Sequence, residues 1–244
     1  MWIIGHRGAS GVAPENTLAA FRRAAELGAR YVETDLQLSR DAHLVALHDD
    51  TLQRTTDGHG PVAAKTLEEL RRLDAGSWFR GAGNGEGRYA GERIPTVEEV
   101  LAFGREHDIG LFLEIKAPRA SGAEHAVVAA VHAASALLST NVISFDLDVL
   151  ARVRKIEPVL LLGYLFNKRS PDAVAQAVDA GARTVLPRAD RVTPELVEEA
   201  GRNDIKVVTW TVNDPQRMKA LIAMGVDGIM TDFPDRLAAL VRGD

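Results

Sequence analysis

The sequence contains no cysteine in 244 residues. Disulfides, thiolate zinc sites, iron–sulfur clusters and a cysteine nucleophile are therefore excluded. Long apolar runs are also missing, since none approaches the roughly 18 residues that span a bilayer, and no basic flank precedes an apolar segment after Met1. We therefore expect a cytoplasmic protein without stable membrane association, whose chemistry depends on His, carboxylate, Lys, Ser or Arg side chains.

Positive charge is in short supply as well. With 29 Lys and Arg against 34 Asp and Glu, the formal net charge is −5, whereas proteins that bind nucleic acid usually carry a basic surface. We therefore expect no nucleic-acid partner. The length and the 46% of apolar residues suit a single globular domain over residues 1–244, and the composition leaves the oligomeric state open.

Short aliphatic runs alternate with amphipathic stretches along almost the whole chain, which is the pattern of an α/β protein with parallel strands. We predict strands at residues 2–5, 31–38, 43–48, 111–115, 141–145, 159–165, 183–187, 206–211 and 227–231. We predict helices at residues 16–28, 66–74, 96–107, 121–138, 146–156, 171–180, 193–203, 214–224 and 234–242. Pro171, Pro194 and Pro215 each fall where a first helical residue is expected.

The second and third predicted strands are separated only by residues 39–42. A parallel crossover needs about a dozen residues or more, so these two strands must form a hairpin. Eight parallel strands then remain, and about 250 residues is the usual size of a (β/α)8 TIM barrel. We therefore predict a TIM barrel with a β-hairpin after the second strand and a small insertion around residues 49–95. A doubly wound open sheet is the alternative, but no G-x-G-x-x-G follows the first strand.

Residues 76–93 interrupt the alternation, because they contain six glycines and show little periodicity. Long loops without secondary structure inside a compact domain are often functional. If this loop lies beside the mouth of the barrel, Trp78, Phe79 and Tyr89 could cover a bound ligand and exclude water. An equally weighted interpretation is a surface loop without a function.

Active sites of TIM barrels lie at the carboxyl ends of the strands. The polar residues at those positions of the predicted strands therefore become the candidate site residues. They are His6, Arg7, Glu33, Asp35, His48, Glu114 and Lys116, and a late strand adds Trp210.

Three of these candidates are carboxylates. Glu33 and Asp35 are two residues apart on one strand and point to the same side, and Glu114 and Lys116 repeat that spacing. Carboxylates that converge repel one another unless a cation joins them, and an all-oxygen set suits Mg²⁺ or Ca²⁺ better than zinc. An equally weighted alternative is a set of buried salt bridges with Arg7 and Lys116 that holds no metal.

His6 and His48 bring two imidazoles to the same end of the barrel. A single histidine at a strand end is more often structural than catalytic, but two of them beside three carboxylates favour a catalytic role. Together with Arg7 and Lys116 they describe a site for an anion whose bond cleavage needs both a base and an acid.

Several segments resemble one family in the same order along the chain. They are IIGHRGASGVAPENTLAAF, YVETDLQLSRDAHLVALHDDTLQRTTDGHG, IPTVEEVL, LFLEIK, VVTWTVND and GVDGIMTDFPD. Together they resemble the glycerophosphodiester phosphodiesterases, in particular the short bacterial members, over nearly the whole chain. The resemblance implies a metal-dependent TIM-barrel enzyme that hydrolyses glycerophosphodiesters to glycerol 3-phosphate and an alcohol.

The resemblance also implies a role for each matching position. His6 and His48 match the acid/base pair, Glu33, Asp35 and Glu114 the metal ligands, and Arg7 and Lys116 the phosphate binders; Glu15 and Asn16 match supporting residues, and Trp210 the lining of the glycerol pocket. Two of these have simpler interpretations, because Asn16 can cap the helix in which Thr17 lies and Trp210 can fill the barrel.

Three competing functions remain. A Schiff-base aldolase would use Lys116 at its strand end. A related phospholipase D of the sphingomyelinase type shares the barrel and the two histidines, but such enzymes are secreted and disulfide-bonded, whereas this chain has no cysteine and we expect it to be cytoplasmic. A phosphate-binding module without catalysis is disfavoured, because the acid, base and metal positions are all filled together.

Overall fold

The computed structural model describes residues 1–81, 88–116 and 122–243. In these residues eight parallel strands form a barrel, which closes through the pairing of the first strand with both the second and the last. The eight strands are β1 (Trp2–Gly5), β2 (Tyr31–Leu38), β4 (Gly110–Ile115), β5 (Thr140–Ser144), β6 (Leu161–Phe166), β7 (Thr184–Pro187), β8 (Lys206–Thr209) and β9 (Gly228–Thr231). The predicted TIM barrel is thus confirmed, and the open sheet is wrong.

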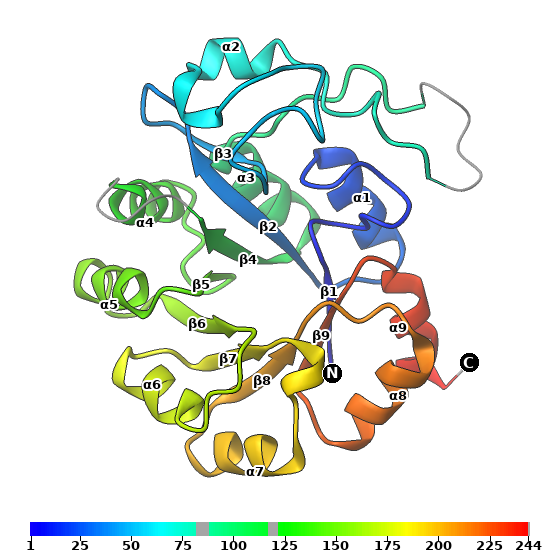
Figure 1. Ribbon diagram of the computed structural model, residues 1–244, viewed down its shortest axis with the longest axis vertical. Coiled ribbons are helices and arrows are strands. Elements are labelled where there is room, and N and C mark those ends of the chain that lie inside the picture. Colours follow the sequence, from blue (N-terminus) through cyan, green and yellow to red (C-terminus); the bar gives the residue numbers. More distant parts are fainter. Residues whose placement is uncertain (82–87, 117–121, 244) are drawn as a thin grey trace.

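Helices surround the barrel on the outside (Figure 1). The α-helices of the described residues are α1 (Leu18–Glu26), α2 (Leu67–Arg71), α3 (Val97–His107), α4 (Ala123–Ala133), α5 (Leu147–Ile156), α6 (Ala173–Asp179), α7 (Pro194–Arg202), α8 (Pro215–Ala223) and α9 (Pro234–Arg242), and the same residues contain the 3₁₀ turns η1 (Val62–Ala64) and η2 (Ala189–Arg191). Pro194 and Pro215 begin α7 and α8, as predicted. Pro171 does not begin a helix, because α6 starts two residues later with Asp172 as its N-cap.

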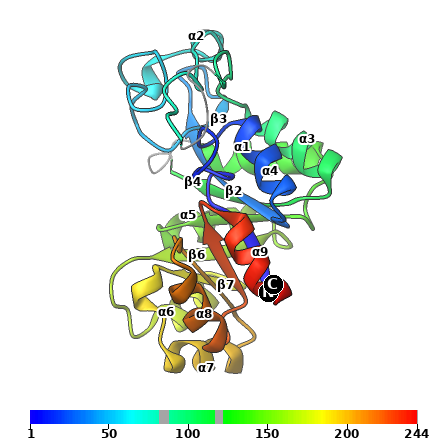
Figure 2. The same ribbon diagram turned by 90° about the vertical axis from the view of Figure 1, so that its right-hand side faces the viewer.

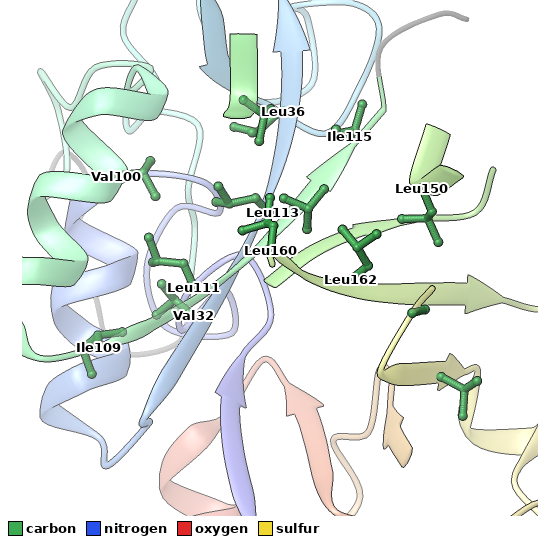
Figure 3. Close-up of a cluster of buried hydrophobic side chains, with 14 of the residues drawn as sticks. Val32, Leu36, Val100, Ile109, Leu111, Leu113, Ile115, Leu150, Leu160 and Leu162 are labelled. Atoms are coloured by element: carbon green, nitrogen blue, oxygen red, sulfur yellow. The ribbon is translucent and has the colours of Figure 1, made fainter. Parts of the chain in front are cut away.

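Apolar side chains pack between the barrel and its helices. Figure 3 shows part of this layer, in which Val32 and Leu36 of β2 and Leu111 and Leu113 of β4 lie near Val100 of α3. These side chains are at most 1% exposed. Burial of one such side chain contributes about 1.5–3 kcal/mol to the stability of the fold. This apolar layer therefore fixes the positions of β2 and β4, whose carboxyl ends carry polar candidate residues.

The barrel interior is filled below the site. Ile4, Phe112, Ile143, Leu165, Leu186, Val208 and Met230 form one buried cluster, to which seven strands contribute. At its amino end the rings of Trp2, Tyr31 and Phe112 lie 5.3–6.2 Å apart between centroids. The interior is therefore a packed core, and ligands have access from the carboxyl end of the strands.

The predicted hairpin is present but shorter than expected. Strand β3 (Leu44–Ala46) pairs antiparallel with β2, with Leu36 opposite Ala46, whereas we predicted a strand over residues 43–48. An insertion follows that contains η1 and α2 and lies at one end of the molecule in both views (Figures 1 and 2). It has its own apolar cluster, which consists of Val45, Leu47, Leu52, Val62, Leu70, Ala75 and Ile94.

Residues 76–93 are partly described, because residues 82–87 lie outside the described part of the chain. Asp74 holds both ends of the segment, since its carboxylate accepts hydrogen bonds from the backbone N–H groups of Gly76, Ser77 and Gly91 (2.8 Å each). The ring of Phe79 packs against both Trp78 and Tyr89, at 5.7 and 5.8 Å between centroids.

A helix that crosses a membrane must have sufficient length and apolar character. In residues 1–81, 88–116 and 122–243, no helix is long and apolar enough to span a bilayer.

Candidate active site

A pocket of about 200 Å³ opens at the carboxyl ends of the barrel strands. Its polar lining consists of His6, Arg7, Glu33, His48, Glu114 and Lys116. Its apolar lining consists of Ile143, Phe145, Leu165, Trp210 and Met230. The structure therefore brings the predicted catalytic, phosphate-binding and glycerol-binding residues to one place.

Three carboxylates converge beside this pocket. One oxygen from each of Glu33, Asp35 and Glu114 lies within 4.8 Å of the others, and the three residues are 2%, 1% and 8% exposed. The sequence produces this arrangement because Glu33 and Asp35 lie two residues apart on β2 and therefore point to the same side of the strand. The register of β2 with β4 places Asp35 beside Glu114.

The three carboxylates do not ionise equally in the protein alone. Burial and the neighbouring Asp35 carboxylate raise the pKa of Glu33 well above its usual range and that of Glu114 to about 7. Burial also disfavours the charged form of Asp35, but Arg7 and Lys116 outweigh it and lower the pKa of that carboxyl. A divalent cation with oxygen ligands would remove this repulsion, so the donor set fits Mg²⁺ or Ca²⁺.

Two cationic side chains border the carboxylates. The Lys116 Nζ atom lies 3.0 Å from Glu114 Oε1 and 3.4 Å from Asp35 Oδ1, and Arg7 Nε lies 3.1 Å from Asp35 Oδ2. The salt bridges of the metal-free alternative are therefore present at Asp35 and Glu114. Among the described residues, Glu33 forms no ion pair and accepts a hydrogen bond from the Arg7 backbone N–H (2.9 Å).

His6 is held by a carboxylate at the end of β9. Its Nδ1 atom lies 2.8 Å from Asp232 Oδ1, and Asp232 also accepts hydrogen bonds from Ser10 Oγ and Asn213 Nδ2. Burial opposes the charge of Asp232, but these partners lower its pKa. An anionic Asp232 requires the proton on His6 Nδ1, which leaves Nε2 as the atom for proton transfer.

His48 has a matching arrangement in the same pocket. Its Nδ1 atom lies 2.7 Å from Oδ1 of the adjacent Asp49, and Gln37 Nε2 donates to the His48 backbone carbonyl (3.3 Å). Burial lowers the pKa of His48 despite the opposing effects of Asp35 and Asp49. The neutral imidazole is therefore favoured near neutral pH.

The two predicted supporting residues lie behind Arg7 and Asp35. Glu15 accepts a hydrogen bond from Arg7 Nη1 (2.8 Å). Asn16 is buried and donates to Asp35 Oδ2 (2.9 Å). Asn16 does not cap the following helix: Thr17 is the N-cap of α1 and accepts from the Ala20 N–H (3.2 Å). Asn16 instead lies in the left-handed region at φ 57°, which directs its amide towards β2.

Two aromatic rings also line the pocket. The rings of Trp210 and Phe145 meet edge to face, with centroids 5.5 Å apart, and Trp210 Nε1 donates to the Leu186 carbonyl (2.7 Å). Trp210 therefore packs against the barrel and also lines the pocket, and its contact with glycerol stays a prediction. Phe145 is 41% exposed and had escaped the sequence reasoning.

The aromatic residues of the 76–93 loop lie outside the described lining of the pocket. Within the described chain, Trp78, Phe79 and Tyr89 are absent from the pocket lining. Tyr89 Oη instead donates to the Val12 carbonyl (3.2 Å), on the loop that follows β1. The expectation that these rings cover a bound ligand stays a prediction, and residues 82–87 lie outside the described part of the chain.

Asp232 and Asn213 are two further site residues that the sequence did not predict. Both follow strands and lie within the segments GVDGIMTDFPD and VVTWTVND, so their strand-end positions were the available signal. The pairing itself was not readable, because Asp232 meets a histidine 226 positions away in the sequence.

Known proteins are similar to this chain in both sequence and fold. A model of the glycerophosphoryl diester phosphodiesterase family matches residues 6–236. The glycerophosphodiester phosphodiesterase of Caldanaerobacter subterraneus is 40% identical over 242 residues, which cover 98% of this chain and 97% of that protein.

Solved structures agree with this. One is the structure of a phosphodiesterase of Oleispira antarctica in complex with the product sn-glycerol-3-phosphate. It is 29% identical to this chain, with a TM-score of 0.88, and the match covers 99% of this chain and 97% of the other. A glycerophosphodiester phosphodiesterase from Agrobacterium tumefaciens is 28% identical with a TM-score of 0.85 and covers 98% and 99%. The resemblance found in the motifs is thus confirmed, and the chain belongs to the glycerophosphoryl diester phosphodiesterase family.

Proposed function

We propose that this protein is a metal-dependent hydrolase that cleaves glycerophosphodiesters to sn-glycerol 3-phosphate and an alcohol. The observation that carries the proposal is the meeting of three buried carboxylates, two imidazoles and two cationic side chains around one pocket. Membership of the family and the product bound to the Oleispira antarctica relative support the same activity.

In this proposal Glu33, Asp35 and Glu114 hold a divalent cation, Mg²⁺ or Ca²⁺. Their convergence within 4.8 Å supports the assignment, as does the burial that keeps competing water away. The bound cation would supply Lewis-acid polarisation of a phosphoryl oxygen.

Arg7 and Lys116 bind the phosphodiester anion. Both line the pocket and lie next to the carboxylates, so the anion is attracted to the side of the pocket where bond cleavage takes place. The aromatic side, with Trp210 and Phe145, suits the carbon face of a glycerol unit.

His6 and His48 transfer the protons. Each has its Nδ1 atom bound to an aspartate, so each presents Nε2 for the reaction. One histidine removes the proton of the attacking hydroxyl group, which belongs to water or to the glycerol of the substrate. The other histidine protonates the leaving oxygen. Proton transfer by a positioned side chain contributes about 10²- to 10⁴-fold per group.

The Schiff-base aldolase is not favoured. A lysine that attacks a carbonyl must be neutral. Burial alone would lower the pKa of Lys116, but Glu114 and Asp35 outweigh it and raise the pKa. Lys116 therefore remains an ammonium ion, which suits the binding of phosphate.

The decisive experiment measures release of sn-glycerol 3-phosphate from a panel that includes glycerophosphocholine and glycerophosphoethanolamine, with and without a chelator. We expect turnover that the chelator abolishes and that Mg²⁺ or Ca²⁺ restores. Lack of release with every diester, or full turnover after metal removal verified by elemental analysis, would reject the proposal. Borohydride trapping with a carbonyl substrate tests the aldolase in the same preparation, and an adduct at Lys116 would favour it.

We also propose that the substrates are water-soluble. The protein works in the cytoplasm, without nucleic acid or stable membrane association. Residues 1–244 form one domain, with its insertion at residues 49–95. The net charge of −5 supports the proposal that nucleic acid and membranes are not partners, because it opposes approach to anionic bilayers and to nucleic acid. Comparable turnover on phospholipid vesicles and on soluble diesters would contradict the substrate class. Cell fractionation tests the location, and calorimetric unfolding in one transition tests the single domain.

A further inference from the structure

Arg54 lies in the insertion, six residues after His48, and the chain around it is well anchored. Leu52 is fully buried in the apolar cluster of the insertion. Thr56 is 8% exposed, and its hydroxyl donates to the Leu52 carbonyl (2.7 Å) and accepts from the Gly58 N–H (3.0 Å). The insertion thus presents Arg54 from a fixed backbone.

The Arg54 guanidinium binds the carboxylate that holds His48. Its Nε atom donates to Asp49 Oδ2 (2.7 Å) and its Nη2 atom to Asp49 Oδ1 (2.8 Å). Asp49 Oδ1 is also the atom that contacts His48 Nδ1. Asp49 is therefore bound on one side by Arg54 and on the other by the imidazole.

The same guanidinium binds the carboxylate that holds Arg7. Its Nη1 and Nη2 atoms donate to Glu15 Oε2 and Oε1, at 2.7 Å each. Glu15 Oε1 in turn accepts from Arg7 Nη1 (2.8 Å). Glu15 and Arg54 are 39 positions apart in the sequence, so this contact joins the insertion to the loop that follows β1.

We propose that Arg54 is a positioning residue, which fixes His48 and Arg7 relative to each other by joining Asp49 to Glu15. The inference rests on the proposed function for the roles of His48 and Arg7, since Arg54 is absent from the described lining of the pocket. It also assigns a purpose to the insertion, which supplies the connecting guanidinium.

The geometry distinguishes this contact from an ordinary surface ion pair. Exposed pairs contribute little, but here four hydrogen bonds of 2.7–2.8 Å engage two carboxylates in the forked geometry that only an arginine provides. Although Arg54 itself is 44% exposed, Glu15 is 12% exposed. The hydrogen bond from Arg54 is also the largest effect that lowers the pKa of Asp49, and an anionic Asp49 keeps the His48 proton on Nδ1.

Arg71 provides a matched control. It also lies in the insertion, is 35% exposed, and donates from Nη1 and Nη2 to the two carboxylate oxygens of Glu99 at 2.7 Å each. Glu99 belongs to the capping box of α3 and is absent from the described pocket lining. Replacement of Arg71 therefore removes a comparable ion pair without touching the site.

The test compares the variants Arg54→Ala, Arg54→Lys and Arg71→Ala. With glycerophosphocholine as substrate we expect Arg54→Ala to lower kcat/KM by about 10- to 100-fold, because misplacement of a catalytic group by about 1 Å costs up to 10²-fold. Both parameters should change, kcat through His48 and KM through Arg7. Arg54→Lys keeps the charge but not the fork, so it should fold normally and recover only part of the loss. Arg71→Ala should lose stability and keep the wild-type kcat and KM.

A second readout is independent of turnover. In ¹⁵N-labelled protein, the wild-type His48 ring should be a single Nδ1-protonated tautomer, and in Arg54→Ala it should become a mixture of tautomers. Wild-type kinetics and a wild-type His48 spectrum in folded Arg54→Ala or Arg54→Lys would overturn the inference. If the wild-type protein releases no sn-glycerol 3-phosphate, the proposed function fails, and the His48 spectrum still decides whether Arg54 positions the ring.

Discussion

Replacement of Asn16 tests how the carboxylate cluster is held in place. The side chain is 3% exposed, and its Nδ2 atom donates to Asp35 Oδ2 (2.9 Å). Its Oδ1 atom accepts from Thr34 Oγ1 (2.7 Å) and from the Asp35 N–H (3.3 Å). The residue also has a φ of 57°, a conformation that asparagine tolerates better than most residues.

The expected loss can be estimated from these contacts. A hydrogen bond to a charged group contributes about 1.5–3 kcal/mol and a neutral one about 1 kcal/mol, so Asn16→Ala should cost roughly 4 kcal/mol through its three lost bonds. Alanine in the left-handed region adds about 1 kcal/mol. Against the total stability of about 5–15 kcal/mol that is usual for a folded protein, this would be one of the most damaging single changes in the chain.

Urea unfolding monitored by circular dichroism, with a chelator present, measures this loss. Asn16→Gly is the control, because glycine adopts the same backbone without strain and loses the same hydrogen bonds, so it should be about 1 kcal/mol more stable than Asn16→Ala. Calorimetric titration with Mg²⁺ should show weaker binding in both variants, since Asp35 is less well oriented. A loss below about 1 kcal/mol in Asn16→Ala, which is the size of one ordinary hydrogen bond, would refute the reasoning.

Three further predictions concern the cluster, the histidines and the loop. Glu114→Gln should weaken the binding of Mg²⁺ in calorimetric titration because a neutral amide replaces an anionic ligand, whereas Glu124→Gln, which alters a buried carboxylate paired with Arg152 on the outside of the barrel, should leave it unchanged; equal losses would argue against the metal assignment. His6→Ala and His48→Ala should each lower kcat by about 10²- to 10⁴-fold in metal-saturated protein, and the double variant should be little worse than either because the two act as a unit; near wild-type rates in both single variants would contradict the mechanism. Hydrogen bonds from Ser77, Gly76 and Gly91 overcome the effect of burial and lower the pKa of Asp74 to about 2, so its contribution to stability is present above its unfolded pKa of about 3.9 and disappears as the pH falls through about 2. Between those values the unfolding free energy of the wild type should fall more steeply than that of Asp74→Asn, and parallel curves would rule this out.

Much of the fold could be predicted because its signals are local. The short separation of residues 39–42 required a hairpin, and that hairpin set the strand count to eight parallel strands. The ends of elements were less predictable, since they depend on which residue caps the helix. Pro171 looked like a helix start, but Asp172 is the N-cap of α6, and α4 covers Ala123–Ala133 where residues 121–138 were expected.

Some residues of the candidate site could likewise be predicted from local signals, and others could not. The positions of Glu33, Asp35 and Glu114 followed from strand periodicity and from the rule that neighbouring parallel strands end at one edge. The contacts of Asp232 and Arg54 could not be found in this way, because their partners are brought to them by the closure of the barrel and by the packing of the insertion. Long-range contacts of this kind leave no periodic trace in a sequence.

Closure of the barrel between β1 and β9 also determines the order in which the site can assemble. The carboxylates come from β2 and β4, which are adjacent in the sheet, so their cluster can form in a chain whose last strands are still unpaired. The contact of His6 with Asp232 needs β1 and β9 to meet across 226 positions, with Trp2 opposite Gly228, and contacts of such separation form late because the intervening chain must first be ordered. During synthesis a nascent chain could therefore bring its three carboxylates together before His6 meets Asp232. With the proposed function, hydrolysis would require the closed barrel, whereas cation binding by the three carboxylates would require only β2 and β4 to pair.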